Sequence, residues 1–147
     1  MKKVHIFLFL GTLLVVGLFI NSFTGNVVKQ DLEVIEIPIS EISREANFYE
    51  HNKDGLLIKY FVVEDEKGNI KTAFNECDVC FQSQLGYRQE GDSMVCNNCG
   101  NRYPISGLGT ENRAGGGCWP GYLPSRVEGE NLVIEISDLN SGERLFR

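Results

Sequence analysis

The chain has 147 residues, of which 42% are hydrophobic and 23% charged, so it can form one globular domain with a core but hardly two. This composition excludes a chain that is disordered throughout. Lys and Arg number 14 against 20 Asp and Glu, giving a formal net charge of −6, which argues against nucleic acid as a partner because phosphate backbones are bound by basic surfaces.

The first element is an apolar run from Val4 to Ile20, whose only strongly polar residue is His5 at its start. A membrane-spanning helix needs about 20 residues and tolerates about 17. Lys2 and Lys3 precede the run, and such positive residues tend to stay on the cytoplasmic side. The sequence therefore predicts a single transmembrane helix in contact with membrane lipid, with the remaining chain outside the cytoplasm.

A cleaved signal peptide is the alternative interpretation of this run. The run is long for the apolar part of a signal peptide, and residues 21–26 offer no Ala-x-Ala-like cleavage site. We therefore expect residues 1–26 to form an uncleaved anchor with its tether. Residues 27–147 are expected to form one exported β domain.

Short alternating segments predict that this domain is mostly β, as a small all-β or α+β fold. The first such segment is 33–39, where Pro38 favours an edge strand because proline cannot donate to a β ladder. A short helical turn is expected to begin at Ser40 and to lie around residues 42–46. His51 is expected in a solvated turn that covers 51–55.

A β-hairpin is predicted next, formed by the aromatic and β-branched segments 56–63 and 70–74 around an acidic turn. Near the end of the chain, segment 130–136 again alternates between polar and apolar residues. Segment 138–142 is rich in turn-forming residues, so it is expected to be a turn that leads to the last two apolar residues.

The spacing of the cysteines is the feature of the sequence that points to a specific chemistry. The five cysteines are Cys77, Cys80, Cys96, Cys99 and Cys118. The first four form two Cys-x-x-Cys pairs separated by 15 residues, which is a strong signal for a metal site. In each pair the short gap turns both sulfurs toward one point, and tetrahedral thiolate coordination needs two such loops facing each other. Segments 86–89 and 93–95 predict a hairpin that places the two loops side by side.

Cys118 stands in an unusual loop, directly after three glycines at 115–117 and directly before Trp119. Glycine allows the backbone and the thiol to approach another group closely. We therefore expect Cys118 to complete or cap a metal centre. Tyr87, Trp119 and Tyr122 are expected to limit the access of solvent to it.

Alternatives to a metal centre, and the identity of the metal, stay open at this point. Two structural disulfides fit poorly, because a disulfide within Cys-x-x-Cys closes a very small ring and is usually labile. A thiol–disulfide oxidoreductase is a weaker alternative, since neither pair lies between a strand and a convincing helix. Four thiolates suit zinc, a single iron and an iron–sulfur cluster about equally. A structural zinc module that binds a protein partner is therefore the main alternative.

The ordered motifs resemble those of the FtrD-like family, which is described as membrane-associated iron–sulfur-containing proteins linked to bacterial iron transport. The matching segments are Ala73–Cys80, Gly86–Asp92, Met94–Gly100 and Gly116–Cys118. The resemblance extends over about residues 34–146. It implies that the four paired cysteines, with Cys118 as a further candidate, hold iron or an iron–sulfur centre.

The sequence thus predicts a membrane-anchored, extracytoplasmic protein that binds iron or an iron–sulfur cluster. We expect an accessory role in iron transport or electron transfer more than an enzymatic activity, with an integral-membrane iron transporter or redox protein as the partner. No Ser/His/Asp or His-Glu-x-x-His arrangement of a hydrolase occurs in the sequence.

Overall fold

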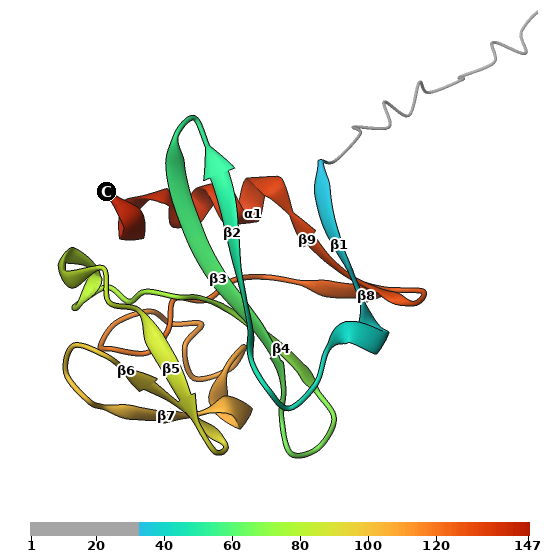
Figure 1. The fold of residues 1–147 in the computed structure, drawn as a ribbon, viewed down its shortest axis with the longest axis horizontal. Helices are drawn as coiled ribbons and strands as arrows, with labels where there is room; N and C mark the ends of the chain where they lie inside the picture. Colours follow the sequence, from blue (N-terminus) through green and yellow to red (C-terminus); the bar gives the residue numbers. More distant parts are fainter. Residues whose placement is uncertain (1–32) are drawn as a thin grey trace, which may run out of the picture. The chain divides into compact units, whose positions relative to one another are not determined.

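Strands dominate residues 33–147, the part of the chain that this computed structural model describes (Figure 1). The strands are β1 (Val34–Pro38), β2 (Asn47–Lys53), β3 (Leu56–Glu64), β4 (Ile70–Phe74), β5 (Tyr87–Glu90), β6 (Ser93–Cys96), β7 (Arg102–Pro104), β8 (Arg126–Glu128) and β9 (Asn131–Glu135). The helical elements are the α-helix α1 (Ile136–Ser141) and the 3-10 helices η2 (Ile39–Glu41), η3 (Phe81–Ser83), η4 (Ile105–Gly107) and η5 (Gly142–Phe146).

The strands form three antiparallel sheets of three strands each, in the orders β1-β9-β8, β2-β3-β4 and β5-β6-β7. The prediction of a mostly β domain is confirmed. Pro38 ends the edge strand β1 opposite Asn131, as expected for a residue that cannot donate to a ladder. The two predicted hairpins are present as β3–β4 and β5–β6.

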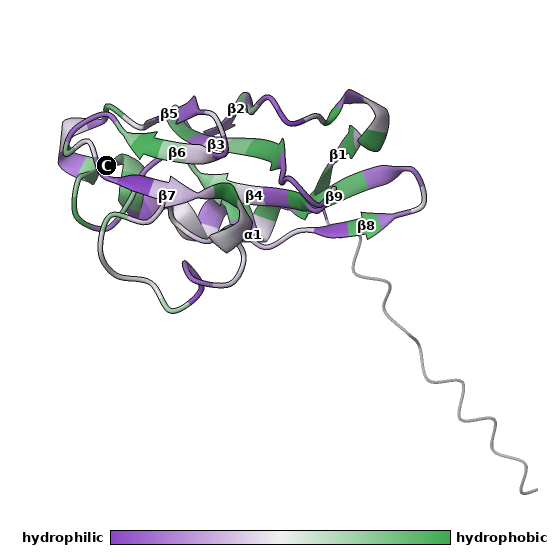
Figure 2. Ribbon diagram, turned by 90° about the horizontal axis from the view of Figure 1, so that it is seen from below, coloured by the Kyte–Doolittle hydropathy of each residue, from purple (hydrophilic) through white to green (hydrophobic). Residues whose placement is uncertain are grey.

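Strand β3 separates two hydrophobic cores because its side chains alternate between its two faces. Tyr60 and Val62 belong to the first core, together with residues of β1, β9 and the C-terminal helices. Phe61 and Val63 belong to the second core, which also contains most of the cysteines. Figure 2 shows hydrophobic residues along β3 and β6 and mostly hydrophilic residues along β7. The second core is therefore the framework of the candidate site.

Strand β2 corrects the expectation that His51 lies in a solvated turn. His51 lies inside β2, opposite Ile58, and is half-buried. The turn is restricted to Asp54 and Gly55, which both have positive φ, of 52° and 91°. An Asp-Gly pair of this kind forms a two-residue hairpin turn, so the strand continues up to Lys53.

Two further local predictions need correction. The helical turn expected to begin at Ser40 is present as η2 (Ile39–Glu41), but it ends before residues 42–46, which are not helical. The turn expected at 138–142 is instead helical, because α1 covers 136–141 and η5 follows it without a gap. Leu139 is fully buried on this segment, and packing of its apolar face outweighs the turn preference of the Asp, Asn and Ser residues around it.

The predicted transmembrane helix at residues 4–20, with its tether, lies outside the described residues. Among residues 33–147 we find no helix long and apolar enough to span a bilayer.

Candidate metal centre

Four cysteine sulfurs converge in the second core. Their Sγ atoms all lie within 4.8 Å of one another, and the residues are Cys80, Cys96, Cys99 and Cys118. We call this group the four-sulfur cluster. Thiolates bound to one tetrahedral metal at about 2.3 Å would lie about 3.8 Å apart. The donor set and its spacing therefore fit a thiolate-bound metal ion or iron–sulfur centre.

The two Cys-x-x-Cys loops have the same kind of turn. In the first loop, the Phe81 N–H donates to the Cys77 carbonyl at 3.1 Å, and the Cys80 N–H donates to the Cys77 sulfur at 3.2 Å. In the second loop, the Gly100 N–H donates to the Cys96 carbonyl at 2.9 Å, with Gly100 at φ 74°. Glycine adopts this left-handed conformation without strain. The expected pair of tight cysteine turns is therefore present.

The β5–β6 hairpin brings these loops together. Cys96 is the last residue of β6 and pairs with Tyr87 of β5. The Asn97 N–H then donates to the Gly86 carbonyl at 3.0 Å, which ties the second cysteine loop to the residue directly before β5. The Asn97 side chain adds a hydrogen bond to the Leu85 carbonyl at 2.8 Å.

Cys77 is a predicted ligand that the structure does not bring into the four-sulfur cluster. Its side chain is fully buried in the same core. The sulfur of Cys118 instead lies 3.3 Å from that of Cys80. The spacing of the first four cysteines favoured Cys77, whereas the geometry favours the cysteine that follows the three glycines.

The loop that carries Cys118 is fixed at its backbone. The Tyr87 hydroxyl donates to the Cys118 carbonyl at 2.5 Å. Gly115, Gly116 and Gly117 have φ values of 68°, 89° and 68°, a succession that residues with a Cβ rarely adopt. The three glycines therefore allow the chain to turn so that Cys118 reaches the other sulfurs.

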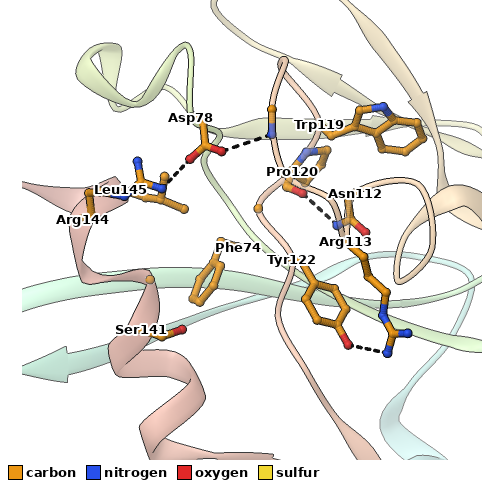
Figure 3. Close-up of a pocket in the computed structure, with 14 residues that line it drawn as sticks. Phe74, Asp78, Asn112, Arg113, Trp119, Pro120, Tyr122, Ser141, Arg144 and Leu145 are labelled. Atoms are coloured by element: carbon orange, nitrogen blue, oxygen red, sulfur yellow. Dashed lines mark hydrogen bonds and ion pairs between the residues drawn. The ribbon is translucent and has the colours of Figure 1, made fainter.

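Asp78 is a residue of the site that the sequence analysis missed. One carboxylate oxygen accepts a hydrogen bond from the Gly116 N–H at 3.4 Å, and the other accepts one from Arg144 at 2.6 Å (Figure 3). The Arg144 guanidinium lowers the pKa of Asp78, against the opposite effect of partial burial. No local signal indicates this role, because Arg144 is 66 positions away in the sequence.

A cavity of ≈170 Å³ lies beside the Cys118 loop, next to Asp78 and Arg144. Tyr122 and Arg113 line its other side, where the Arg113 guanidinium lies 5.1 Å from the centre of the Tyr122 ring and donates to its hydroxyl (Figure 3). No cysteine lines this cavity, so it is separate from the four-sulfur cluster. Tyr122 faces the cavity and was expected at the metal.

Buried polar side chains form hydrogen bonds with the backbone at the start of β5. The sequence analysis did not identify these side chains. Glu76 is 3% exposed and its carboxylate accepts the Gly86 N–H at 2.9 Å. Burial raises the pKa of Glu76. Asn75 accepts the Tyr87 N–H at 2.8 Å. A Cβ at Gly86 would lie 2.6 Å from the Asn75 side chain, so glycine is required for this approach.

Aromatic rings cover one side of the sulfurs. The rings of Tyr103 and Trp119 have centroids 4.8 Å apart, and those of Tyr87 and Tyr103 are 6.4 Å apart. All three rings pack in or against the core that holds the buried cysteines. Tyr87 and Trp119 therefore lie in or against the core that holds the buried cysteines.

The thiols of the cluster differ in acidity. A hydrogen bond from the Asn98 side chain, followed by the contact with Cys118, lowers the pKa of the Cys80 thiol to about 7. Burial raises the pKa of Cys96 to about 11 and raises that of Cys118 as well. A bound cation would favour the thiolate form of all of them, because coordinating thiols are deprotonated.

Comparison with known proteins agrees with this chemistry. The model of a family described as membrane iron-sulfur containing protein FtrD-like matches residues 42–146. The matched region contains all five cysteines and the elements from β2 to η5. A search of curated proteins found no match.

Proposed function

Because the chain belongs to the FtrD-like family of membrane iron–sulfur-containing proteins, we propose that it binds an iron or iron–sulfur centre and serves electron transfer or iron transport at a membrane. The observation that carries this proposal is the four-sulfur cluster, whose Sγ atoms lie within 4.8 Å of one another. Thiolates are the ligands that iron–sulfur centres use most.

The proposed ligands are the four thiolates of the cluster, with Cys77 as a fifth thiol at its margin. When bound, iron would supply a site that gains and loses one electron. The chain's own residues orient the thiolates through the two cysteine turns and through the Tyr87 hydroxyl on the Cys118 carbonyl. Trp119 and Tyr103 exclude water, which influences the potential of such a centre.

Attachment to the membrane would bring this centre close to its partner. The apolar run at 4–20 is proposed to anchor the chain, with the domain outside the cytoplasm. A tethered domain meets an integral-membrane partner at a high effective concentration, so a weak contact suffices for transfer. The proposed partner is an iron transporter or a redox protein in the same membrane.

A structural zinc site is the second candidate. It is favoured by the burial of three of the four clustered thiols, whose residues are 2–8% exposed. Structural zinc sites are closed four-ligand sites whose metal contributes folding free energy directly. In that case the domain would bind a protein partner without transferring electrons.

Anaerobic purification of the full-length chain in detergent separates the two candidates. The proposal predicts stoichiometric iron and visible absorption that bleaches on reduction, whereas zinc thiolate has neither property. The double substitution C96S/C99S is expected to abolish the bound metal, with C77S as the matched single-thiol control. A colourless protein with stoichiometric zinc would contradict the iron proposal, and unchanged iron in C96S/C99S would contradict the ligand assignment.

A further inference from the structure

One residue of the four-sulfur cluster is exposed to solvent. All five cysteines lie in the described part of the chain, and Cys99 alone among them is exposed. Its exposure follows from its place at the outer end of the second cysteine loop, between the exposed residues Asn98 and Gly100. Electron transfer weakens steeply with distance, so the exposed ligand is the shortest route between a bound metal and another molecule.

Two exposed apolar side chains belong to segments that are linked to the cysteine cluster. Val79 is 62% exposed and directly precedes Cys80, whose sulfur belongs to the same cluster. Leu85 is 55% exposed, and its carbonyl accepts a hydrogen bond from Asn97, two residues before Cys99. Only five large apolar side chains are exposed within residues 33–147; one of them, Val79, lies inside the first cysteine pair, and another, Leu85, lies between the two pairs.

The charges near these segments are compensated within the chain. Arg88 lies 2.7 Å from a carboxylate oxygen of Glu90 and donates to the Asn97 side chain at 2.8 Å. Asp78 is paired with Arg144 at 2.6 Å. The charged side chains named here are therefore paired with opposite charges and leave little net charge around Cys99, although residues 33–147 carry 19 acidic against 11 basic side chains.

We propose that electrons enter and leave the metal centre at the surface formed by Val79, Leu85 and Cys99, which we call the Cys99 edge. Its partner would be an electron-carrier protein that meets the edge through an uncharged, partly apolar face. This inference rests on the proposed redox function. Interfaces for electron transfer are small and transient, and a few exposed apolar side chains are sufficient for them. A match of uncharged faces makes association insensitive to salt.

Oxidation by small charged complexes tests the position of the edge. The reduced full-length protein is mixed with ferricyanide, an anion, or with tris(phenanthroline)cobalt(III), a cation. In each reaction the metal centre loses one electron and the complex gains one, with no bond or proton transfer. Visible absorption in a stopped-flow instrument gives the rate.

The test variants are V79E and L85E, with V127E as the matched control. Val127 is 56% exposed but lies on β8, in a different sheet from the cysteines. A new negative charge at the edge is expected to slow oxidation by ferricyanide and to accelerate oxidation by the cobalt complex by about 3- to 10-fold. V127E is expected to change neither rate by more than about 2-fold, since screening limits its effect.

The outcomes separate this inference from the function on which it rests. If the wild-type protein does not bleach on reduction with dithionite, or does not recover its colour with these two oxidants, the redox function fails and the edge fails with it. If the wild-type protein reacts but V79E and L85E behave as V127E does, the centre is redox-active and the Cys99 edge is wrong.

Native membranes test the partner. The rate at which endogenous donors reduce the centre is expected to change by less than about 2-fold between low and high salt, and to fall in L85E more than in V127E. A steep loss of rate with salt would overturn the uncharged partner, and so would the absence of any reduction.

Discussion

Asp78 connects three parts of the molecule through a single carboxylate. It lies within the first Cys-x-x-Cys loop, accepts the Gly116 N–H of the Cys118 loop and pairs with Arg144 of η5. Because Gly116 is two residues before Cys118, Asp78 acts on a proposed metal ligand through the backbone. The interpretation of Asp78 as a positioning residue can be tested without removing a thiol.

The substitution D78N should accelerate the loss of metal to a chelator more than it lowers stability. The Arg144 pair is partly exposed, so its loss should cost about 0.2–1 kcal/mol of unfolding free energy. Loosening of the Cys118 loop should raise the rate of metal loss several-fold. The control is E128Q, which breaks an equally short exposed pair with Arg126 on β8. Equal rates in D78N and E128Q would exclude the positioning role.

Cys77 and Cys118 can be ranked as ligands by a pair of alanine variants. Both side chains are buried, but only the Cys118 sulfur belongs to the four-sulfur cluster. We expect C118A to lose bound metal and C77A to retain it at full stoichiometry, as measured by elemental analysis after anaerobic gel filtration. Loss of metal in C77A with retention in C118A would restore the ligand set that the spacing alone favoured.

The C-terminal helical segment packs closely against β4. A Cβ at Gly142, where η5 begins, would lie 2.3 Å from the Phe74 ring. Because the ring is buried, it has little space to move. The close approach of the segment to the first core therefore depends on the absence of a side chain at this position.

The substitution G142A should destabilise the domain by about 1–3 kcal/mol, the usual cost of overpacking a core. The measurement is the free energy of unfolding in denaturant, with the metal-free protein used throughout to exclude effects of metal loss. S137A, at an exposed position of α1, is the control and should change this free energy by less than about 0.5 kcal/mol. Equal stability of G142A and the wild type would show that the space between Gly142 and the Phe74 ring can hold a methyl group.

Glu143 links η5 to strand β2. Its carboxylate lies 2.7 Å from the Lys53 ammonium and is also paired with Arg147. Lys53, followed by Arg147, lowers the pKa of Glu143 to about 2 from its usual value of 4.5. A lowered pKa in the folded state means that the unfolded chain binds the proton more tightly.

The contribution of Glu143 to stability should therefore be present above pH 4.5 and should be lost as the pH falls toward 2. The E143Q variant lacks this titration, so its melting temperature should fall less steeply than that of the wild type across this window. Circular dichroism melts at a series of pH values provide the comparison. Parallel pH profiles for the two proteins would mean that Glu143 titrates normally.

At the scale of the whole molecule, the sequence predicted best the features that depend on residues close together in the chain. The Cys-x-x-Cys spacing and the alternation of 56–63 and 70–74 predicted the cysteine turns and the β3–β4 hairpin. Both signals depend on residues close together in the chain. The short strands β7 and β8, each of three residues, carry too few residues for alternation to be seen.

The remaining features depend on tertiary contacts. The choice of Cys118 over Cys77 for the four-sulfur cluster requires the glycine loop to fold back over the first cysteine loop. The pairing of Asp78 with Arg144 depends on how η5 meets the first cysteine loop. The two cores on either side of β3 likewise appear only when the sheets are assembled. Spacing along the chain contains no information about such contacts.

Iron-edge X-ray absorption of the anaerobically purified full-length protein tests the central claim most directly. The account predicts that sulfur atoms alone surround the iron, at about 2.3 Å. It also predicts that C118A loses either the iron or one of these sulfur neighbours, whereas C77A gives the wild-type spectrum. Iron bound by oxygen or nitrogen atoms in the wild-type protein would contradict the proposal that the four-sulfur cluster holds it.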